Sequence, residues 1–249
     1  MSKTEPNHPT NLLTPILVKT REDLVWPAGE RTFYLVARDG LYLCRQNEFF
    51  RSCIKTPVGP SELEDQQPFF EPSFPMIPTE LIEQAVGFFT RIADQHGSEA
   101  AALFVHDRTR DEVHLVVPHQ VATMGGSSSD YRYPIGVRYD SPTDLPEDWV
   151  VFGDIHCHVD YAAYASHTDV HDELHSAGLH VVVGRIQQDP PDFHVEAVVD
   201  GKRFVLDPDD VFLGFGAREM AVPEQWLERV EVIVEKYEPI RYSSIYSVN

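Results

Sequence analysis

Alternating and helically spaced apolar residues divide the chain into predicted elements. Residues 31–56 are rich in β-formers, and their apolar runs flank Asp39-Gly40, a dipeptide that favours a tight hairpin. From Thr79 onward, apolar residues keep helical spacing as far as His96-Gly97, where a glycine can adopt the left-handed conformation that ends a helix. The pattern predicts a small N-terminal sheet followed, further on, by an amphipathic helix.

Beyond Gly97 the pattern predicts an alternation of strands and helices. Strands are expected at 98–105, 112–117, 149–155 and 179–186, with a hairpin over 193–206 that turns at Asp200-Gly201. Helices are expected at 166–177 and 222–234. Residues 118–147, which include Gly125-Gly126-Ser127, predict a long irregular loop, and loops of that length are usually functional or mobile.

Proline and acidic residues concentrate between Pro57 and Pro78, which is typical of a linker or an extended cover segment. We therefore divide the chain into an N-terminal β-rich extension with a proline-rich linker, residues 1–77, and a main domain, residues 78–249. The fold class expected for the main domain is α/β.

Charge and cysteine content narrow the classes of function. Among 249 residues, 40 are acidic and 20 basic, giving a formal charge of −20 that disfavours binding to nucleic acid. No apolar run approaches the roughly 20 residues of a membrane helix, and residues 1–10 do not resemble a secretory signal. The three cysteines form no disulfide framework, so we expect a cytoplasmic protein without a membrane or nucleic-acid partner.

The segment around His156 and His158 carries the clearest chemistry. Residues two apart on a strand project to the same side, so both imidazoles can bind one ion. Ser166 follows after seven residues and Asp169 after two more, three positions apart on one face of a predicted helix start. Two imidazoles and one carboxylate leave a fourth tetrahedral position open, as in catalytic zinc sites.

The pattern His156-x-His158-x7-Ser166-x2-Asp169 resembles the motif of the JAMM (JAB1/MPN/Mov34) zinc metalloproteases, and the match looks closest to divergent prokaryotic, deubiquitinase-like branches of that family. The resemblance covers about residues 78–206. It implies a cytidine-deaminase-like fold, a mixed β-sheet flanked by helices. Cys157 and Val159 depart from the serine and proline usual at those positions.

The resemblance also implies roles for the site residues. His156, His158 and Asp169 would bind Zn²⁺, Glu99 would act as general acid and base on the attacking water, and Ser166 would stabilise the oxyanion. The implied activity is hydrolysis of an amide or isopeptide bond at the C-terminus of a ubiquitin-like protein. Substrates would be such a protein or its conjugates, and E1-like and E2-like proteins encoded nearby are implied partners.

Several residues remain open alternatives within this interpretation. Glu112, on the next predicted strand, is the rival to Glu99, and His167 is a rival metal ligand. Asp172 could accept a hydrogen bond from the imidazole of a metal-binding histidine. Cys157 lies between the two histidines, faces away from them and is expected to be buried and inert. The nearby polar residues are otherwise expected to form a solvated helix face with a capping acid: Asp154, Asp160, His167, His171, Asp172, Glu173 and His175.

Two other functions compete with the peptidase. His-x-His also occurs in amidohydrolase and phosphoesterase barrels, but those need about 200 residues and a run of strand-helix units that does not follow His158 here. A scaffold or binding subunit of the same fold is the other alternative, and retention of all five motif residues argues against it.

Overall fold

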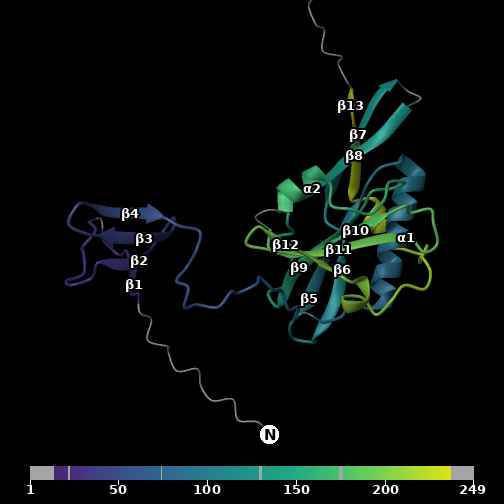
Figure 1. Cartoon of the computed structure of the whole chain (residues 1–249). Helices are drawn as coiled ribbons and strands as arrows, with labels where there is room; N and C mark the ends of the chain where they lie inside the picture. Colours follow the sequence, from purple (N-terminus) through teal and green to yellow (C-terminus); the bar gives the residue numbers. More distant parts are fainter. Residues whose placement is uncertain (1–13, 22, 74, 129–130, 174–175, 237–249) are drawn as a thin grey trace, which may run out of the picture. The chain divides into compact units, whose positions relative to one another are not determined.

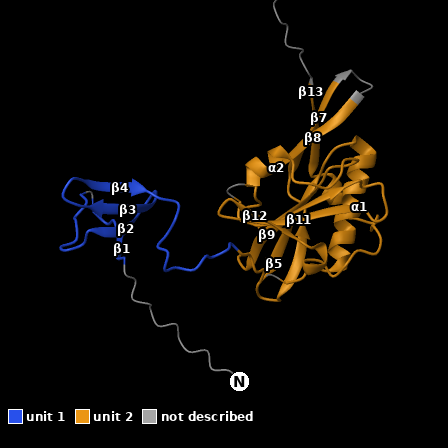
Figure 2. Ribbon diagram, in the orientation of Figure 1, with its two compact units in different colours: residues 1–68 blue, residues 69–249 orange. Residues whose placement is uncertain are grey.

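The chain divides into two compact units in the computed structural model, which describes residues 14–21, 23–73, 75–128, 131–173 and 176–236. Unit 1 comprises residues 1–68 and unit 2 residues 69–249 (Figure 2). The division falls after Pro68, inside the proline-rich stretch. Among the helices that the structure describes, none combines the length and the apolar character needed to cross a membrane.

Unit 1 is built on a four-stranded sheet in the order β1-β2-β3-β4. Its strands are β1 (Ile16–Val18), β2 (Thr32–Ala37), β3 (Gly40–Gln46) and β4 (Arg51–Lys55). The predicted hairpin at Asp39-Gly40 is confirmed, since β2 and β3 pair antiparallel around it. Gly40 has a φ of 140°, a conformation that side chains rarely allow.

The long helix of unit 2, α1 (Thr79–His96), matches its prediction. It ends at Gly97, whose φ of 67° is the left-handed cap expected there. Its apolar face contributes Phe88 and Phe89 to the main hydrophobic core. The helix thereby covers one face of the central sheet.

The central sheet of unit 2 has six strands in the order β12-β11-β10-β9-β5-β6 (Figure 1). β9 and β10 are parallel, and every other neighbouring pair is antiparallel, so the sheet is mixed and the fold is α/β. The strands are β5 (Ala101–Asp107), β6 (Glu112–Val116), β9 (Trp149–Cys157), β10 (Gly178–Gly184), β11 (Asp192–Val199) and β12 (Lys202–Leu206).

Strand alternation gives the sheet two chemically different faces. On β9, Ile155 and Cys157 join the core that contains α1. His156, between them, projects to the opposite face. On β10, His180 alternates with the core residues Leu179 and Val181 in the same way. The polar side chains of the central strands therefore gather on the face away from α1.

The predicted loop over residues 118–147 is wrong, because most of it forms a hairpin. β7 (Gln120–Ser128) and β8 (Tyr131–Tyr139) pair antiparallel within a three-stranded sheet of order β13-β7-β8. Gly125 signalled a loop, but it lies opposite Tyr133, whose ring would be 2.5 Å from a Cβ placed at Gly125. The glycine makes room for a cross-strand aromatic ring, a tertiary reason that local sequence does not reveal.

The predicted helix over 222–234 is also wrong. Only α3 (Glu224–Leu227) is helical, and β13 (Val230–Lys236) pairs parallel to β7. Its valines recur at every second position, which favours a strand. The tail after Lys236 lies outside the described residues.

The helix predicted over 166–177 is shorter than expected, since α2 (His167–Asp172) ends well before Gly178, which instead begins β10. The first strand after α1 begins at Ala101, so Glu99 precedes β5 instead of starting it. A short 3-10 helix, η2 (Pro208–Asp210), follows β12. Glu99 therefore lies just before β5, and Asp169 lies in the first turn of α2 as predicted.

Candidate metal centre

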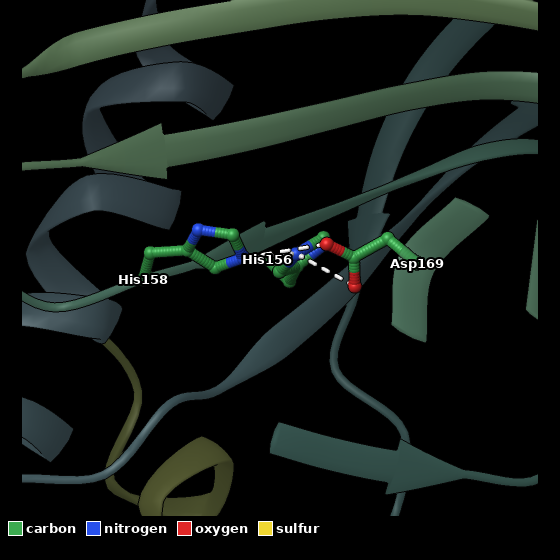
Figure 3. A group of neighbouring side chains, drawn as sticks. All are labelled: His156, His158 and Asp169. Carbon is green, nitrogen blue, oxygen red and sulfur yellow. Dashed lines mark hydrogen bonds and ion pairs between the residues drawn. The ribbon is translucent and has the colours of Figure 1, made fainter. Parts of the chain in front are cut away.

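Two histidines and one aspartate converge on the polar face of the central sheet (Figure 3). His156 comes from β9, His158 follows its last residue, and Asp169 lies in the first turn of α2. The two histidine Nε2 atoms are 3.2 Å apart. Asp169 Oδ1 is 3.6 Å from Nε2 of His156, and Asp169 Oδ2 is 3.4 Å from Nε2 of His158. The predicted ligands are thus brought together by the fold.

This donor set fits a zinc ion. With Zn–N bonds of about 2.0–2.1 Å, two nitrogens of a tetrahedral site lie about 3.3–3.4 Å apart. The observed separation of 3.2 Å is close to that value. Both histidines are buried, at 7% and 5% exposure, and a cation there would meet water from the side of the cavity that they line. His156, His158 and Asp169 would be its protein ligands.

The spacing of Ser166 and Asp169 has a structural cause in the first turn of α2. Ser166 is the N-cap, and its Oγ accepts a hydrogen bond from Asp169 N at 3.2 Å. Asp169 Oδ2 in return accepts one from Ser166 N at 2.6 Å. This reciprocal capping box holds the carboxylate toward the histidines and leaves the Ser166 hydroxyl hydrogen available to another acceptor.

The charge states of His156 and Asp169 depend on each other. Burial favours the neutral imidazole of His156. The hydrogen bond and the charge of Asp169 outweigh burial and raise the pKa of His156 to about 9. Burial would raise the pKa of Asp169, yet its contacts with His156, His158 and Ser166 bring that pKa well below the usual range. Positive charge nearby therefore stabilises the Asp169 carboxylate, and a divalent cation bound here would compete with the imidazole protons for that place.

A cavity of about 570 Å³ opens over the three ligands, and Glu99 lines it. Glu99 is outside the ligand group itself. Burial raises the pKa of its carboxyl, while the charges of His156 and His158 oppose that effect. The rival Glu112 is exposed at the start of β6 and does not line this cavity. Of these two carboxylates, Glu99 is the one that lies at the cavity.

Comparisons with solved structures give remote likenesses, two of which are described here. No protein-family model matches the chain, and no curated protein matches it. A protein from Desulfitobacterium hafniense, determined in solution, is similar at 14% identity and a TM-score of 0.34, over 65% of this chain and 94% of its own. A JAB1/MPN domain protein from Archaeoglobus fulgidus is similar at 14% identity and a TM-score of 0.28, over 58% and 99%. Likenesses at this level assign neither residues nor a reaction.

A second polar cluster beside the ligands was missed at the sequence level. His180 donates from Nδ1 to Asp154 at 2.8 Å and from Nε2 to the carbonyl oxygen of Ser176 at 3.1 Å. Burial disfavours its charge, but Asp154 outweighs burial and raises its pKa. Glu173 lies 3.6 Å from the same imidazole and pairs with Arg203 at 2.6 Å. With both ring nitrogens engaged, this group is satisfied as an ion-pair cluster.

This cluster corrects one prediction. Glu173, expected on a solvated helix face, is 8% exposed and caps the C-terminal end of α2. Its contacts with β10 and β12 fix the end of the helix whose first turn carries Asp169. The available signal was Asp154, two positions before His156 and so on the same strand face, but its partner His180 depends on strand pairing.

The other residues considered at the sequence level lie outside the group formed by His156, His158 and Asp169. His167 and His171 are exposed, and neither is in the ligand group. Asp172 is exposed but lines the cavity. Cys157 is fully buried in the core, as predicted, and burial raises its pKa to about 12. His175 lies outside the described residues.

Proposed function

We propose that this chain is a zinc-dependent peptidase or isopeptidase of the JAMM type. Its reaction would be hydrolysis of an amide bond at the C-terminus of a ubiquitin-like protein. The observation that carries the proposal is the convergence of His156, His158 and Asp169 within a cavity that Glu99 also lines. The spacing His156-x-His158-x7-Ser166-x2-Asp169 supports it independently.

The chain's own residues supply the rest of the chemistry. Zinc, when bound, makes water acidic enough to attack at neutral pH and polarises a carbonyl. Glu99 accepts the proton of the attacking water and passes it to the leaving amine, as a general base and then a general acid. The Ser166 hydroxyl donates to the developing oxyanion, because its oxygen already accepts from Asp169 N and its hydrogen stays available.

Strand β8 supplies an edge for an extended substrate. In the described part of its sheet, β8 pairs only with β7, and residues 134–139 line the cavity. An extended peptide can add a strand to such an edge, so that main-chain hydrogen bonds supply affinity. A C-terminal tail bound along β8 would bring its scissile bond to the proposed metal ligands.

A barrel hydrolase receives no support from the fold. The described residues of unit 2 form a six-stranded mixed sheet and a three-stranded sheet. An amidohydrolase or phosphoesterase barrel instead repeats parallel strand-helix units. A non-enzymatic scaffold remains the alternative, and the activity test must distinguish it from a peptidase.

The test is cleavage of ubiquitin-like proteins fused at their C-terminus to a reporter, using the full chain loaded with zinc. Cleavage should stop with a chelator and return with added zinc. Glu99→Gln should lower the rate by about 10²–10⁴-fold while zinc stays bound, because only proton transfer is lost. The matched control Glu112→Gln should cleave like the unmodified chain, since Glu112 is exposed outside the cavity.

Two results would count against the peptidase. Unchanged cleavage in Glu99→Gln would remove the assigned base, and cleavage that survives the chelator would remove the metal. Stoichiometric zinc without cleavage of any fusion would instead favour a binding subunit.

A further inference from the structure

Two cysteines of unit 1 face each other across neighbouring strands. Cys44 on β3 is the direct partner of Cys53 on β4, and their sulfur atoms lie 2.9 Å apart. Both are free thiols. Neither belongs to the metal centre, which lies in unit 2.

The position of this pair in the β-ladder suits a covalent bond. Asn47 N donates to Phe50 O at 2.9 Å, which makes Asn47 and Phe50 a hydrogen-bonded pair. Hydrogen-bonded and non-hydrogen-bonded pairs alternate, so Cys44 and Cys53, three positions along, form a non-hydrogen-bonded pair. Cα atoms in such pairs are about 4.5 Å apart, within the roughly 4.4–6.8 Å that disulfides span. A bond here would require little backbone movement.

The core of unit 1 is small enough for a cross-link to matter. Its cluster of buried apolar side chains consists of Phe33, Leu35 and Cys44, with Leu17, Trp26 and Tyr42 packed against it. Domains of this size are marginally stable on core burial alone and often depend on a disulfide or a metal. Within the described residues, the groups able to hold a metal lie in unit 2. The cysteine pair is thus the cross-link that unit 1 offers.

The two thiols differ in access. Cys53 is exposed, while Cys44 is fully buried, and burial raises the pKa of Cys44 to about 12. Arg51 and Lys55 lie two positions either side of Cys53, on its face of the strand. Lys55 pairs with Asp39 at 3.6 Å, so Arg51 is the cation whose charge favours an anionic reagent at this sulfur. Cys53 is therefore the sulfur that an external reagent meets first, with Cys44 behind it.

We propose that Cys44 and Cys53 form a site of reversible disulfide formation, oxidised by exchange with a low-molecular-weight disulfide of the glutathione class. Cys53, as its thiolate, attacks one sulfur of oxidised glutathione, forms a mixed disulfide and releases one glutathione thiol. Cys44, after losing its proton, attacks the Cys53 sulfur and releases the second. Two protein thiols lose two electrons, one glutathione disulfide gains them, and excess reduced glutathione reverses the exchange.

The sequence around the pair gives a direct assay. Trypsin cleaves after Arg38, Arg45, Arg51 and Lys55, so Cys44 leaves in peptide 39–45 and Cys53 in peptide 52–55. The full chain is incubated with oxidised glutathione, its remaining thiols are alkylated, and the digest is measured by mass spectrometry without reduction. We expect the two peptides to be recovered joined, and to separate after reduction. Cys157 should be alkylated only after unfolding, because it is buried in unit 2.

Single variants test the order of attack. Cys44→Ser should stop at a stable mixed disulfide on Cys53, whereas Cys53→Ser should leave Cys44 unmodified while the chain is folded. Hydrogen exchange of the full chain adds a second readout. Oxidation should slow exchange in β3 and β4 and leave unit 2 unchanged, because the bond closes a loop only in unit 1.

Recovery of peptides 39–45 and 52–55 as separate alkylated or glutathione-bearing species after oxidation would overturn the proposal. Modification of Cys44 in Cys53→Ser at the rate seen for Cys53 in Cys44→Ser would overturn the order of attack.

Discussion

At the scale of single residues, the capping box at the start of α2 connects helix stability to the proposed metal site. Ser166 and Asp169 satisfy each other's backbone N–H groups at 3.2 and 2.6 Å. The same Asp169 carboxylate lies 3.4 Å from His158 and 3.6 Å from His156. One turn of helix therefore positions the candidate ligand Asp169 and presents the Ser166 hydroxyl at the same cavity.

Replacing Ser166 separates its two roles. Ser166→Ala should cost about 1 kcal/mol in the free energy of unfolding, whereas Ser166→Gly should cost only a few tenths, because glycine is a tolerated N-cap. Both should lower the cleavage rate by about 10²–10³-fold, the usual effect of losing one oxyanion donor. Urea unfolding and initial rates on the reporter fusion measure these quantities. A Ser166→Gly chain with the unmodified rate would limit the hydroxyl to capping.

The three candidate ligands could be predicted from sequence because much of their geometry is local. Alternation along a strand places His156 and His158, and the N-cap spacing places Asp169. The partner of Asp154 could not be predicted, because His180 reaches it only through the parallel register of β9 and β10. Non-local pairing of this kind leaves no periodic signal in the chain.

At the scale of elements, strong local signals gave correct predictions and tertiary pairing produced the errors. α1 carries helical periodicity over five turns and a glycine cap, so its bounds follow from sequence. β7 and β8 were predicted as a loop because Gly125-Gly126-Ser127 signalled irregular structure, but Gly125 lies opposite Tyr133 and makes room for its ring. β13 was predicted as helix although its valines alternate, and its pairing with β7 decides the outcome.

A glycine inside α1 tests how tightly this helix is packed. Gly87 is buried, and a Cβ placed there would lie 1.7 Å from the carbonyl oxygen of Glu219. Glu219 N also donates to Glu83 O at 2.9 Å, which holds that segment against the helix. Helix propensity alone predicts that Gly87→Ala stabilises by about 1 kcal/mol, but the clash should reverse the sign and destabilise by about 1–3 kcal/mol.

Urea unfolding at pH 7 measures the effect of Gly87→Ala. An increase in the unfolding free energy would show that the segment around Glu219 is not held against α1.

At the scale of the whole molecule, a charged network spans the polar face of unit 2. Glu196 on β11 is 4% exposed and accepts from Arg203 Nε at 2.6 Å, and His194 Nε2 lies at the same distance. Arg203 also contacts Glu173 at the end of α2. The network ties the two C-terminal strands of the central sheet to the helix that carries Asp169. Burial would raise the pKa of Glu196, but Arg203 and His194 outweigh it and lower that pKa below 4.5.

The network makes the stability of unit 2 sensitive to acid. Because the pKa of Glu196 is lower in the folded state, its charge stabilises the fold above pH 4.5, and this contribution is lost as the pH falls through the folded-state pKa. Glu196→Gln should lower the unfolding free energy at pH 7 by roughly 1.5–3 kcal/mol, the usual worth of a charged hydrogen bond.

Urea unfolding of both chains between pH 7 and pH 3 is the measurement. The difference between them should shrink below pH 4.5, while the exposed control Glu71→Gln should show almost none at any pH. A difference that stays constant across this range would contradict the pKa assignment.

The most direct test of the central claim is the zinc content of the full chain after loading and dialysis. The convergence of His156, His158 and Asp169 predicts one tightly held zinc per chain. His158→Ala and Asp169→Ala should lose it, and the control His171→Ala, exposed on the same helix, should keep it. Absence of zinc from the unmodified chain, or its retention after both ligand substitutions, would contradict the account.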